Sequence, residues 1–190
     1  GVLGGWVQNR SSPWTVDCAL RDLDDVATAS IDIFVFLEPL DHTGGRVFIG
    51  SMVGQYGELL DDNTARIHCV LPTDLEAGNY SLIARWSGGA VYAPSEDSMP
   101  VKVMGDVRIS LNVPRFVTPG STVTATVRLT DSTTGKVLFP ATVGLDAWNG
   151  TETMVELPTS AGGNLTFTAP ALGSYQASCR FEGSELYNPA

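Results

Sequence analysis

Residues 78–94 read GNYSLIARWSGGAVYAP, and residues 173–189 read GSYQASCRFEGSELYNP. The two stretches align without a gap at an offset of 95 residues. Seven of the seventeen positions correspond: Gly78/Gly173, Tyr80/Tyr175, Arg85/Arg180, Trp86/Phe181, Gly88/Gly183, Tyr92/Tyr187 and Pro94/Pro189. This repeat predicts two copies of one structural unit.

The repeat continues upstream with gaps. Residues 16–22 match 125–131, 29–33 match 141–145, and 67–72 match 165–170. The change in offset predicts a 14-residue insertion in the first copy, within 38–62. We therefore expect one domain over 1–104, with this insertion directly after its strand at 29–37, and a second domain over 105–190.

The matched segments alternate between apolar and polar residues, which is the pattern of half-buried strands. Tyr80, Leu82, Ala84 and Trp86 would share one face of a strand, and no segment has a helical period. Turn signals separate the strands, so the class predicted is all-β, with two β-sandwiches. The strands expected are 14–22, 29–37, 65–71, 79–87 and 98–104, then 107–113, 121–130, 141–148, 152–157, 163–169 and 174–182.

The second copy has no counterpart of the strand at 98–104 of the first. We expect the sequence to be a fragment of a longer tandem array. A domain that accepts a strand from a partner would show the same pattern.

The stretch PGSTVTATV (119–127) and the G-x-Y-x-x-x-x-[WF]-x-G-x-x-x-Y-x-P ending resemble bacterial-type immunoglobulin-like repeats of large cell-surface proteins and adhesins. The resemblance implies two tandem immunoglobulin-like Greek-key β-sandwiches that serve as spacers, fibre segments or adhesive heads. Tyr80 and Tyr175 occupy tyrosine-corner positions. Leu82 and Ala177 stand where antibody-type domains have the second cysteine of their bridge, so that bridge is absent.

Charge and motifs narrow the function classes. The net charge of −10 argues against nucleic acid and anionic membranes as partners. No apolar run approaches the roughly 20 residues of a membrane helix, so we expect no direct membrane insertion. Nucleotide, zinc-protease and hydrolase motifs are absent, and we expect neither an enzyme nor a cofactor.

Four of the seven asparagines begin an N-x-S/T motif: Asn9, Asn79, Asn149 and Asn164. Each is an acceptor for N-glycosylation in a secretory pathway. Together with the resemblance, they imply a structural or adhesive module of an extracellular, cell-surface glycoprotein in a eukaryotic or archaeal host. Its partners would be neighbouring immunoglobulin-like domains of the same chain.

The chain has three cysteines, so at least one of them cannot form a disulfide within the chain. Cys18 and Cys69 map to inward positions on two strands that neighbour each other in this fold, so we expect either a cross-strand disulfide or two buried thiols. Cys179 is expected as a core thiol.

The remaining candidates are weaker. His42 falls in a loop and His68 on an outer strand face, and neither has a catalytic partner. Asp22, Asp24, Asp25, Asp61 and Asp62 offer oxygen ligands for calcium without a calcium-binding spacing. The alternative function is a carbohydrate- or calcium-dependent binding domain. A protein or glycan partner would bind at the 38–62 insertion, which we predict to form an added hairpin.

Overall fold

The computed structural model describes residues 6–19, 32–41, 43–53, 58–60, 64–89, 92–138, 143–148, 153–158, 163–169 and 171–190. These ranges contain β-strands and turns and no helix. They therefore contain no helix of membrane-spanning length and apolarity. The chain divides into two compact units, Gly1–Met104 and Gly105–Ala190.

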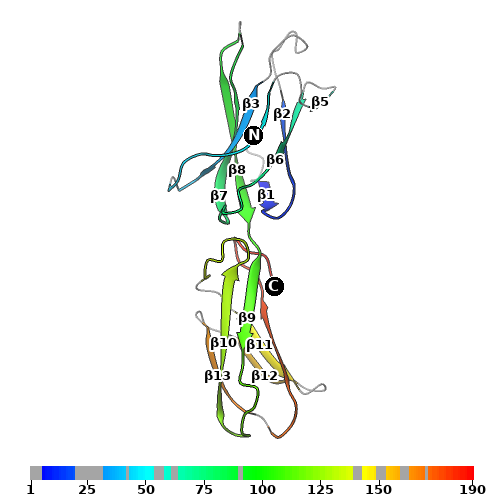
Figure 1. The fold of residues 1–190 in the computed structure, drawn as a ribbon, viewed down its shortest axis with the longest axis vertical. Helices are drawn as coiled ribbons and strands as arrows, with labels where there is room; N and C mark the ends of the chain where they lie inside the picture. The colour runs from blue at the N-terminus through cyan, green and yellow to red at the C-terminus, as the bar shows by residue number, and fades with distance from the viewer. Residues whose placement is uncertain are drawn as a thin grey trace. The chain divides into compact units, whose positions relative to one another are not determined.

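The first unit consists of two facing sheets (Figure 1). One sheet has the order β1 (Trp6–Asn9), β8 (Ser95–Met104), β7 (Gly78–Trp86), β3 (Ile33–Pro39), β4 (Val47–Met52). The other has the order β2 (Trp14–Ala19), β6 (Thr64–Cys69), β5 (Glu58–Leu60). All neighbours are antiparallel except β1, which runs parallel to β8.

The core of this unit lies between the two sheets and follows the predicted alternation. On β3, Ile33, Val35 and Leu37 are at most 2% exposed, whereas the residues between them are only half-buried. The predicted inward face of β7 is confirmed over most of its length. The buried cluster comprises Trp14, Val16, Ile33, Val35, Leu37, Ile49, Met52, Ala65, Ile67, Cys69, Leu75, Tyr80, Leu82, Val101 and Val103.

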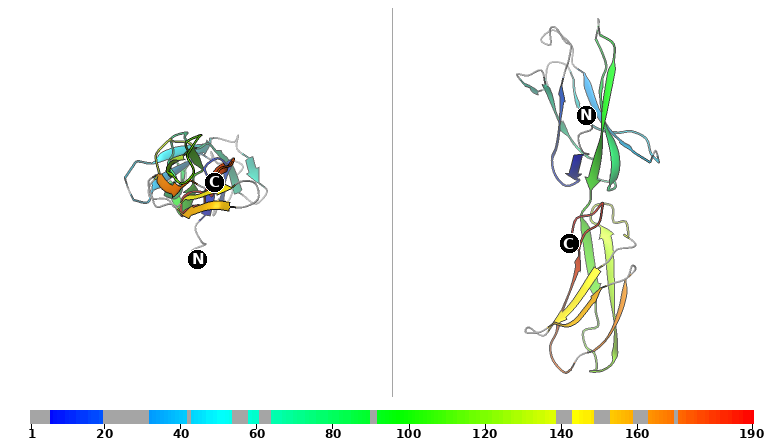
Figure 2. Two further views of the ribbon diagram at one scale, coloured as in Figure 1. Left: turned by 90° about the horizontal axis from the view of Figure 1, so that it is seen from below. Right: turned by 180° about the vertical axis from the view of Figure 1, so that it is seen from behind.

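The second unit also has two sheets, which lie in separate layers when Figures 1 and 2 are compared. One has the order β13 (Asn164–Thr168), β10 (Thr122–Asp131), β9 (Val107–Asn112). The other has the order β12 (Thr153–Pro158), β11 (Val143–Trp148), β14 (Gln176–Phe181). Its described core contains Ala125, Val127, Leu129, Leu165 and Phe181.

The pairing order identifies both units as immunoglobulin-like. In the first, β2, β6 and β5 take the places of strands B, E and D, and β8, β7, β3 and β4 those of G, F, C and C′. In the second, β9, β10 and β13 form the A–B–E sheet, and β14, β11 and β12 form the F–C–C′ sheet. The predicted fold class, two tandem immunoglobulin-like sandwiches, is confirmed.

The strand boundaries differ from the prediction at three places. The short strands β1 and β5 were not expected, because four and three residues are too few to display a period of two. Strand β3 begins at Ile33 rather than at residue 29. The other predicted strands agree with the structure to within about three residues, which is the usual uncertainty of boundaries.

Both units contain the tyrosine corner that the resemblance implied. The Tyr80 hydroxyl donates to the Glu76 carbonyl oxygen at 2.9 Å, and the Tyr175 hydroxyl donates to the Ala171 carbonyl oxygen at 2.6 Å. Each hydroxyl therefore reaches back four residues to the connection that enters strand F. Burial raises the pKa of the Tyr80 phenol, which keeps the donating proton in place.

We predict that Tyr80→Phe lowers the free energy of unfolding of the first unit by about 1 kcal/mol, because it deletes one partly buried hydrogen bond and leaves a carbonyl without its donor. Urea titration followed by tryptophan fluorescence measures the change. Tyr175→Phe is the matched variant and should leave the first unit's midpoint unmoved. An unchanged midpoint for Tyr80→Phe would contradict a stabilising role for this bond.

Candidate functional site

The insertion of the first copy forms the predicted hairpin. Strand β4 pairs antiparallel with β3, with Ile33 opposite Met52 and Leu37 opposite Val47. A register shift between Val35 and Phe36 marks an irregularity in the ladder. The hairpin widens the C–F–G sheet and adds outward-facing side chains to it.

Apolar side chains gather on the outer face of this widened sheet. The rings of Phe36 and Phe48 meet edge to face, with centroids 5.9 Å apart. Phe48 is 53% exposed, whereas Ile83, opposite Phe36 on β7, is only 2% exposed. Ile83 lies outside the buried core cluster, because its neighbours Leu82 and Ala84 take the inward positions.

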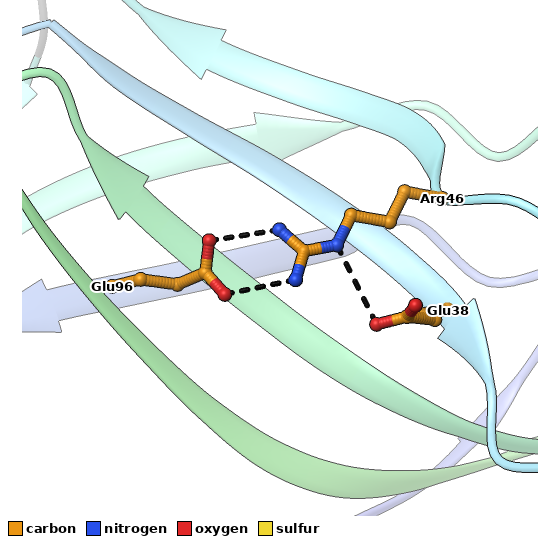
Figure 3. A network of polar contacts seen from close by, with 3 residues as sticks. All are labelled: Glu38, Arg46 and Glu96. Atoms are coloured by element: carbon orange, nitrogen blue, oxygen red, sulfur yellow. Dashed lines mark hydrogen bonds and ion pairs between the residues drawn. The ribbon is translucent and has the colours of Figure 1, made fainter.

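An ion-pair network crosses the same face (Figure 3). The Arg46 guanidinium donates two hydrogen bonds to the Glu96 carboxylate, at 2.8 and 2.9 Å, and its Nε lies 3.5 Å from the Glu38 carboxylate. Arg46 precedes β4 and Glu96 lies on β8, so the pair spans β3 and β7. The register places Glu96 opposite Arg85 and Ile83 between Ser98 and Phe36, so Ile83 lies in the rows that the pair crosses.

The ion pair between Arg46 and Glu96 shifts the pKa values of both side chains, so its strength depends on pH. The hydrogen bond from Arg46 holds the pKa of the Glu96 carboxyl below its ordinary value of 4.5 and raises the pKa of Arg46 itself. Both side chains are about two-fifths exposed, so solvent and salt screen the pair. The network therefore fixes the orientation of Arg46 and Glu96 on the same face as Phe36 and Phe48, and it adds little to the free energy of unfolding.

A groove of about 380 Å³ lies beside the tip of the hairpin. Its walls are the turn between β3 and β4 and the connection between β6 and β7, including Asp41, Asp74, Glu76 and Asn79. The Asp41 carboxylate accepts hydrogen bonds from the amide and the hydroxyl of Thr43. One of its oxygens is therefore engaged in the turn between β3 and β4. Among the described residues, no three His, Cys, Asp or Glu side chains gather to hold a metal ion.

A second cavity, of about 510 Å³, opens between β2 and the strands β3, β7 and β8. Cys18, Trp86 and Met99 line it. The Trp86 ring also packs against Tyr92, with centroids 6.0 Å apart, and its indole N–H is buried with no acceptor among the described residues. The recurring aromatic residues Trp86, Tyr92, Phe181 and Tyr187 are thus packed against their own units.

The cross-strand disulfide is contradicted, and all three cysteines are free thiols. Strands β2 and β6 are neighbours as expected, but Cys18 lies opposite Ala65 and Cys69 lies opposite Trp14. The two cysteines are four positions apart along the ladder, on the order of 13 Å, whereas a disulfide needs Cα atoms within about 7 Å. Burial, as the largest cause, raises the pKa of each of these thiols to about 11.

The remaining cysteine and His68 lie on strands, and the other histidine lies outside the described residues. Cys179 is half-buried against the core of the second unit, and burial raises its thiol pKa. His68 is exposed on the outer face of β6, as predicted. His42 and the calcium candidates Asp22, Asp24, Asp25, Asp61 and Asp62 lie outside the described residues.

Three of the four glycosylation candidates lie at strand ends, and Asn149 lies outside the described residues. Asn79 is the second residue of β7 and Asn164 opens β13, and both are exposed. Asn9 closes β1, is half-buried, and accepts hydrogen bonds from the amide and the hydroxyl of Ser11. The Asn164 side chain accepts a hydrogen bond from Thr126 on β10.

Sequence reasoning placed interest in the insertion but missed Glu96 and Ile83, which lie far from it in the chain. One signal was present. Ser81, Ile83 and Arg85 share the outer face of β7, and the isoleucine interrupts an otherwise polar set. An apolar residue at an outward position indicates that something covers that face.

Comparisons with known proteins add little. No protein-family model matches the chain, and no curated protein matches its sequence. Among solved structures, the amphioxus IgVJ-C2 molecule is similar at 12% identity and a TM-score of 0.44, over 97% of this chain and 95% of that one. The immunoglobulin-like assignment rests on the strand pairing described above.

We predict that the coupling between Arg46 and Glu96 is constant above pH 4.5 and declines below it. The folded-state pKa of Glu96 is depressed, so its stabilisation is present above the ordinary pKa and is lost as the pH falls through the folded one. A double-mutant cycle with Arg46→Met and Glu96→Gln, measured by urea unfolding across pH 3–7, tests this. Coupling that grows on acidification would contradict the assignment.

We predict that Cys18 and Cys69 react with iodoacetamide about a hundredfold more slowly in the native protein at pH 7.5 than in urea, because the thiolate fraction falls tenfold for each unit that the pKa rises. Intact mass spectrometry after timed alkylation gives the rates. A non-reduced mass 2 Da below that of the reduced protein would show a disulfide and contradict the register.

Proposed function

We propose that this chain is a non-catalytic structural and adhesive module of a large extracellular surface glycoprotein, of the kind built from bacterial-type immunoglobulin-like repeats. Two tandem sandwiches support the proposal, because a repeated unit of this type serves to space and present surfaces. The proposal places the chain at the cell surface, joined to further domains of its kind.

The observation that carries the proposal is the position of the glycosylation motifs. Asn79 and Asn164 are exposed at the beginnings of strands, where a glycan extends into solvent without unpairing the ladder. In the Asn9 motif, the serine is already hydrogen-bonded to the asparagine side chain. Acceptors that arose by chance would also fall at inward positions of strand centres, and none of these three does.

The outer face of the β3–β4 hairpin is the proposed adhesive surface. Phe36 and Phe48 supply aromatic area, and Arg46 with Glu38 and Glu96 supplies a charged border. An apolar centre with a polar border is the composition of protein-binding surfaces, and exposed aromatic rings also stack on sugars. A protein or glycan partner fits this face.

We predict that at least two of Asn9, Asn79, Asn149 and Asn164 carry N-glycans when the chain is secreted from a eukaryotic host. Glycopeptide mass spectrometry identifies the sites, and each occupied site loses one glycan mass on Asn→Gln substitution. Asn112 is exposed but lacks the motif, so Asn112→Gln is the control. Four unmodified acceptors in secreted protein would remove the main support for a surface glycoprotein.

A further inference from the structure

The outer face of the β13–β10–β9 sheet in the second unit is polar and contains no acidic residue. The three strands lie side by side, with β10 in the middle (Figure 1). Their odd-numbered residues point to the core, so the even-numbered residues point outward. All of these outward residues are threonine, serine, asparagine or arginine, and all but the half-buried Thr130 are exposed. We call this set of even-numbered residues the hydroxyl face.

Two arginines, Arg108 and Arg128, are neighbours on the hydroxyl face. Arg128 lies opposite Ser110 and Thr130 lies opposite Arg108, so the two arginines are diagonal to each other across β9 and β10. Side chains in this relation begin on the order of 7 Å apart. Neither arginine forms an ion pair with a carboxylate in the described part of the chain. The face therefore presents two adjacent positive charges that no described carboxylate balances.

The equivalent sheet of the first unit balances its charge. There, Arg66 on β6 donates two hydrogen bonds of 2.9 Å to the Asp17 carboxylate, which lies opposite it on β2. The repeat aligns this pair with Asn164 and Thr126, which also lie opposite each other and share a hydrogen bond of 3.0 Å. The second copy thus has a hydroxyl where the first has its carboxylate, and Arg128 has no acidic neighbour at that position.

The acidic groups nearest to the arginine pair in the sequence are engaged elsewhere. The Asp106 carboxylate accepts a hydrogen bond of 2.9 Å from the Asn188 side chain. The Asp131 side chain is 1% exposed and accepts hydrogen bonds from the amides of Thr133 and Thr134. Charges farther away than about 8 Å are largely screened at physiological ionic strength. The local field of the hydroxyl face is therefore positive, although the net charge of the chain is −10.

The composition of the hydroxyl face favours one class of partner. A protein-binding surface has an apolar or aromatic centre, and this face has neither. Single-stranded nucleic acids stack their bases on aromatic rings, which are also absent from this face. A guanidinium binds an oxyanion through two parallel hydrogen bonds, and hydroxyl and amide groups exchange hydrogen bonds with other hydroxyls. A sugar polymer with acidic substituents offers both kinds of group.

We propose that the hydroxyl face binds an acidic polysaccharide, whose sugars carry carboxylate or sulfate groups. Arg108 and Arg128 bind the acidic groups, and the outward threonines of β10 form hydrogen bonds with the sugar hydroxyls. These threonines recur at every second residue, which spaces them by about 7 Å along the strand. The site lies on a different unit from the adhesive surface of the β3–β4 hairpin, and it does not depend on the proposed function.

Isothermal titration calorimetry of the full chain at 0.15 M NaCl tests the proposal with two probes, dextran sulfate and polygalacturonate. The protein is made in bacteria, because a glycan on Asn164 would stand on the hydroxyl face. We expect at least one probe to bind, and the stronger of the two identifies the acidic group. Arg108→Gln combined with Arg128→Gln should weaken binding by about tenfold or more, since two charge-assisted hydrogen-bond donors are lost. Neutral dextran of the same length should not bind.

A matched double variant separates the hydroxyl face from net charge. Arg66→Gln combined with Arg115→Gln removes two positive charges that lie outside the face, and it should leave the affinity unchanged. On the unsubstituted chain, amide chemical shifts in NMR spectra should change along β9 and β10 when the probe is added, and not along β4.

Four results would overturn the proposal. They are the absence of binding to both charged probes, equal binding of neutral dextran, equal losses in the two double variants, and shift changes that bypass β9 and β10. Sedimentation velocity without any probe adds a further check. Self-association that Arg108→Gln and Arg128→Gln abolish would assign the face to a second copy of the chain and would also overturn it.

Discussion

The tyrosine corner fixes the beginning of strand F in each unit, and the first unit depends on the strand that follows it. The Tyr80 hydroxyl donates a hydrogen bond to the Glu76 carbonyl oxygen. This bond ties the connection from β6 to the first residues of β7. Strand β7 then pairs with β3 on one side and with β8 on the other. Its inward residues complete the core. Its outward Ile83 lies opposite Phe36 and so belongs to the apolar outer face with Phe36 and Phe48. A shift of one residue in β7 would exchange these two faces.

The disulfide that joins the sheets of antibody domains is absent from the described residues, whose three cysteines are free thiols. Leu82 follows Tyr80 by two residues and is 3% exposed in the core. Cys18 and Cys69 are near the core as well, but the register of β2 and β6 separates them. That register is common to both copies, since Trp14 lies opposite Cys69 and Val123 lies opposite Phe167. Hydrophobic packing and backbone ladders thus hold each sandwich together without a covalent link among the described residues.

The sequence predicted what is local or repeated, and it failed where distant segments meet. Gly88, Tyr92 and their counterparts were visible as a repeat because a left-handed glycine and its turn bond are built within a few residues. The pairing of Cys18 with Ala65 was not visible, because alternation gives the face of a residue but not its partner across the ladder. The Arg46–Glu96 pair was missed for the same reason. Its members are 50 residues apart in the sequence, and only the order of the strands in the sheet brings them together.

The parallel pairing of β1 with β8 has a consequence for self-association. Over the described residues, β1 covers only Val101–Met104, which leaves the earlier half of β8 at the border of its sheet. That half contains Glu96, Asp97 and Pro100. The Asp97 carboxylate repels a second acidic chain, the Glu96 carboxylate is already paired with Arg46, and a proline has no amide to offer to an approaching strand. The exposed part of this border is therefore a poor template for edge-to-edge aggregation.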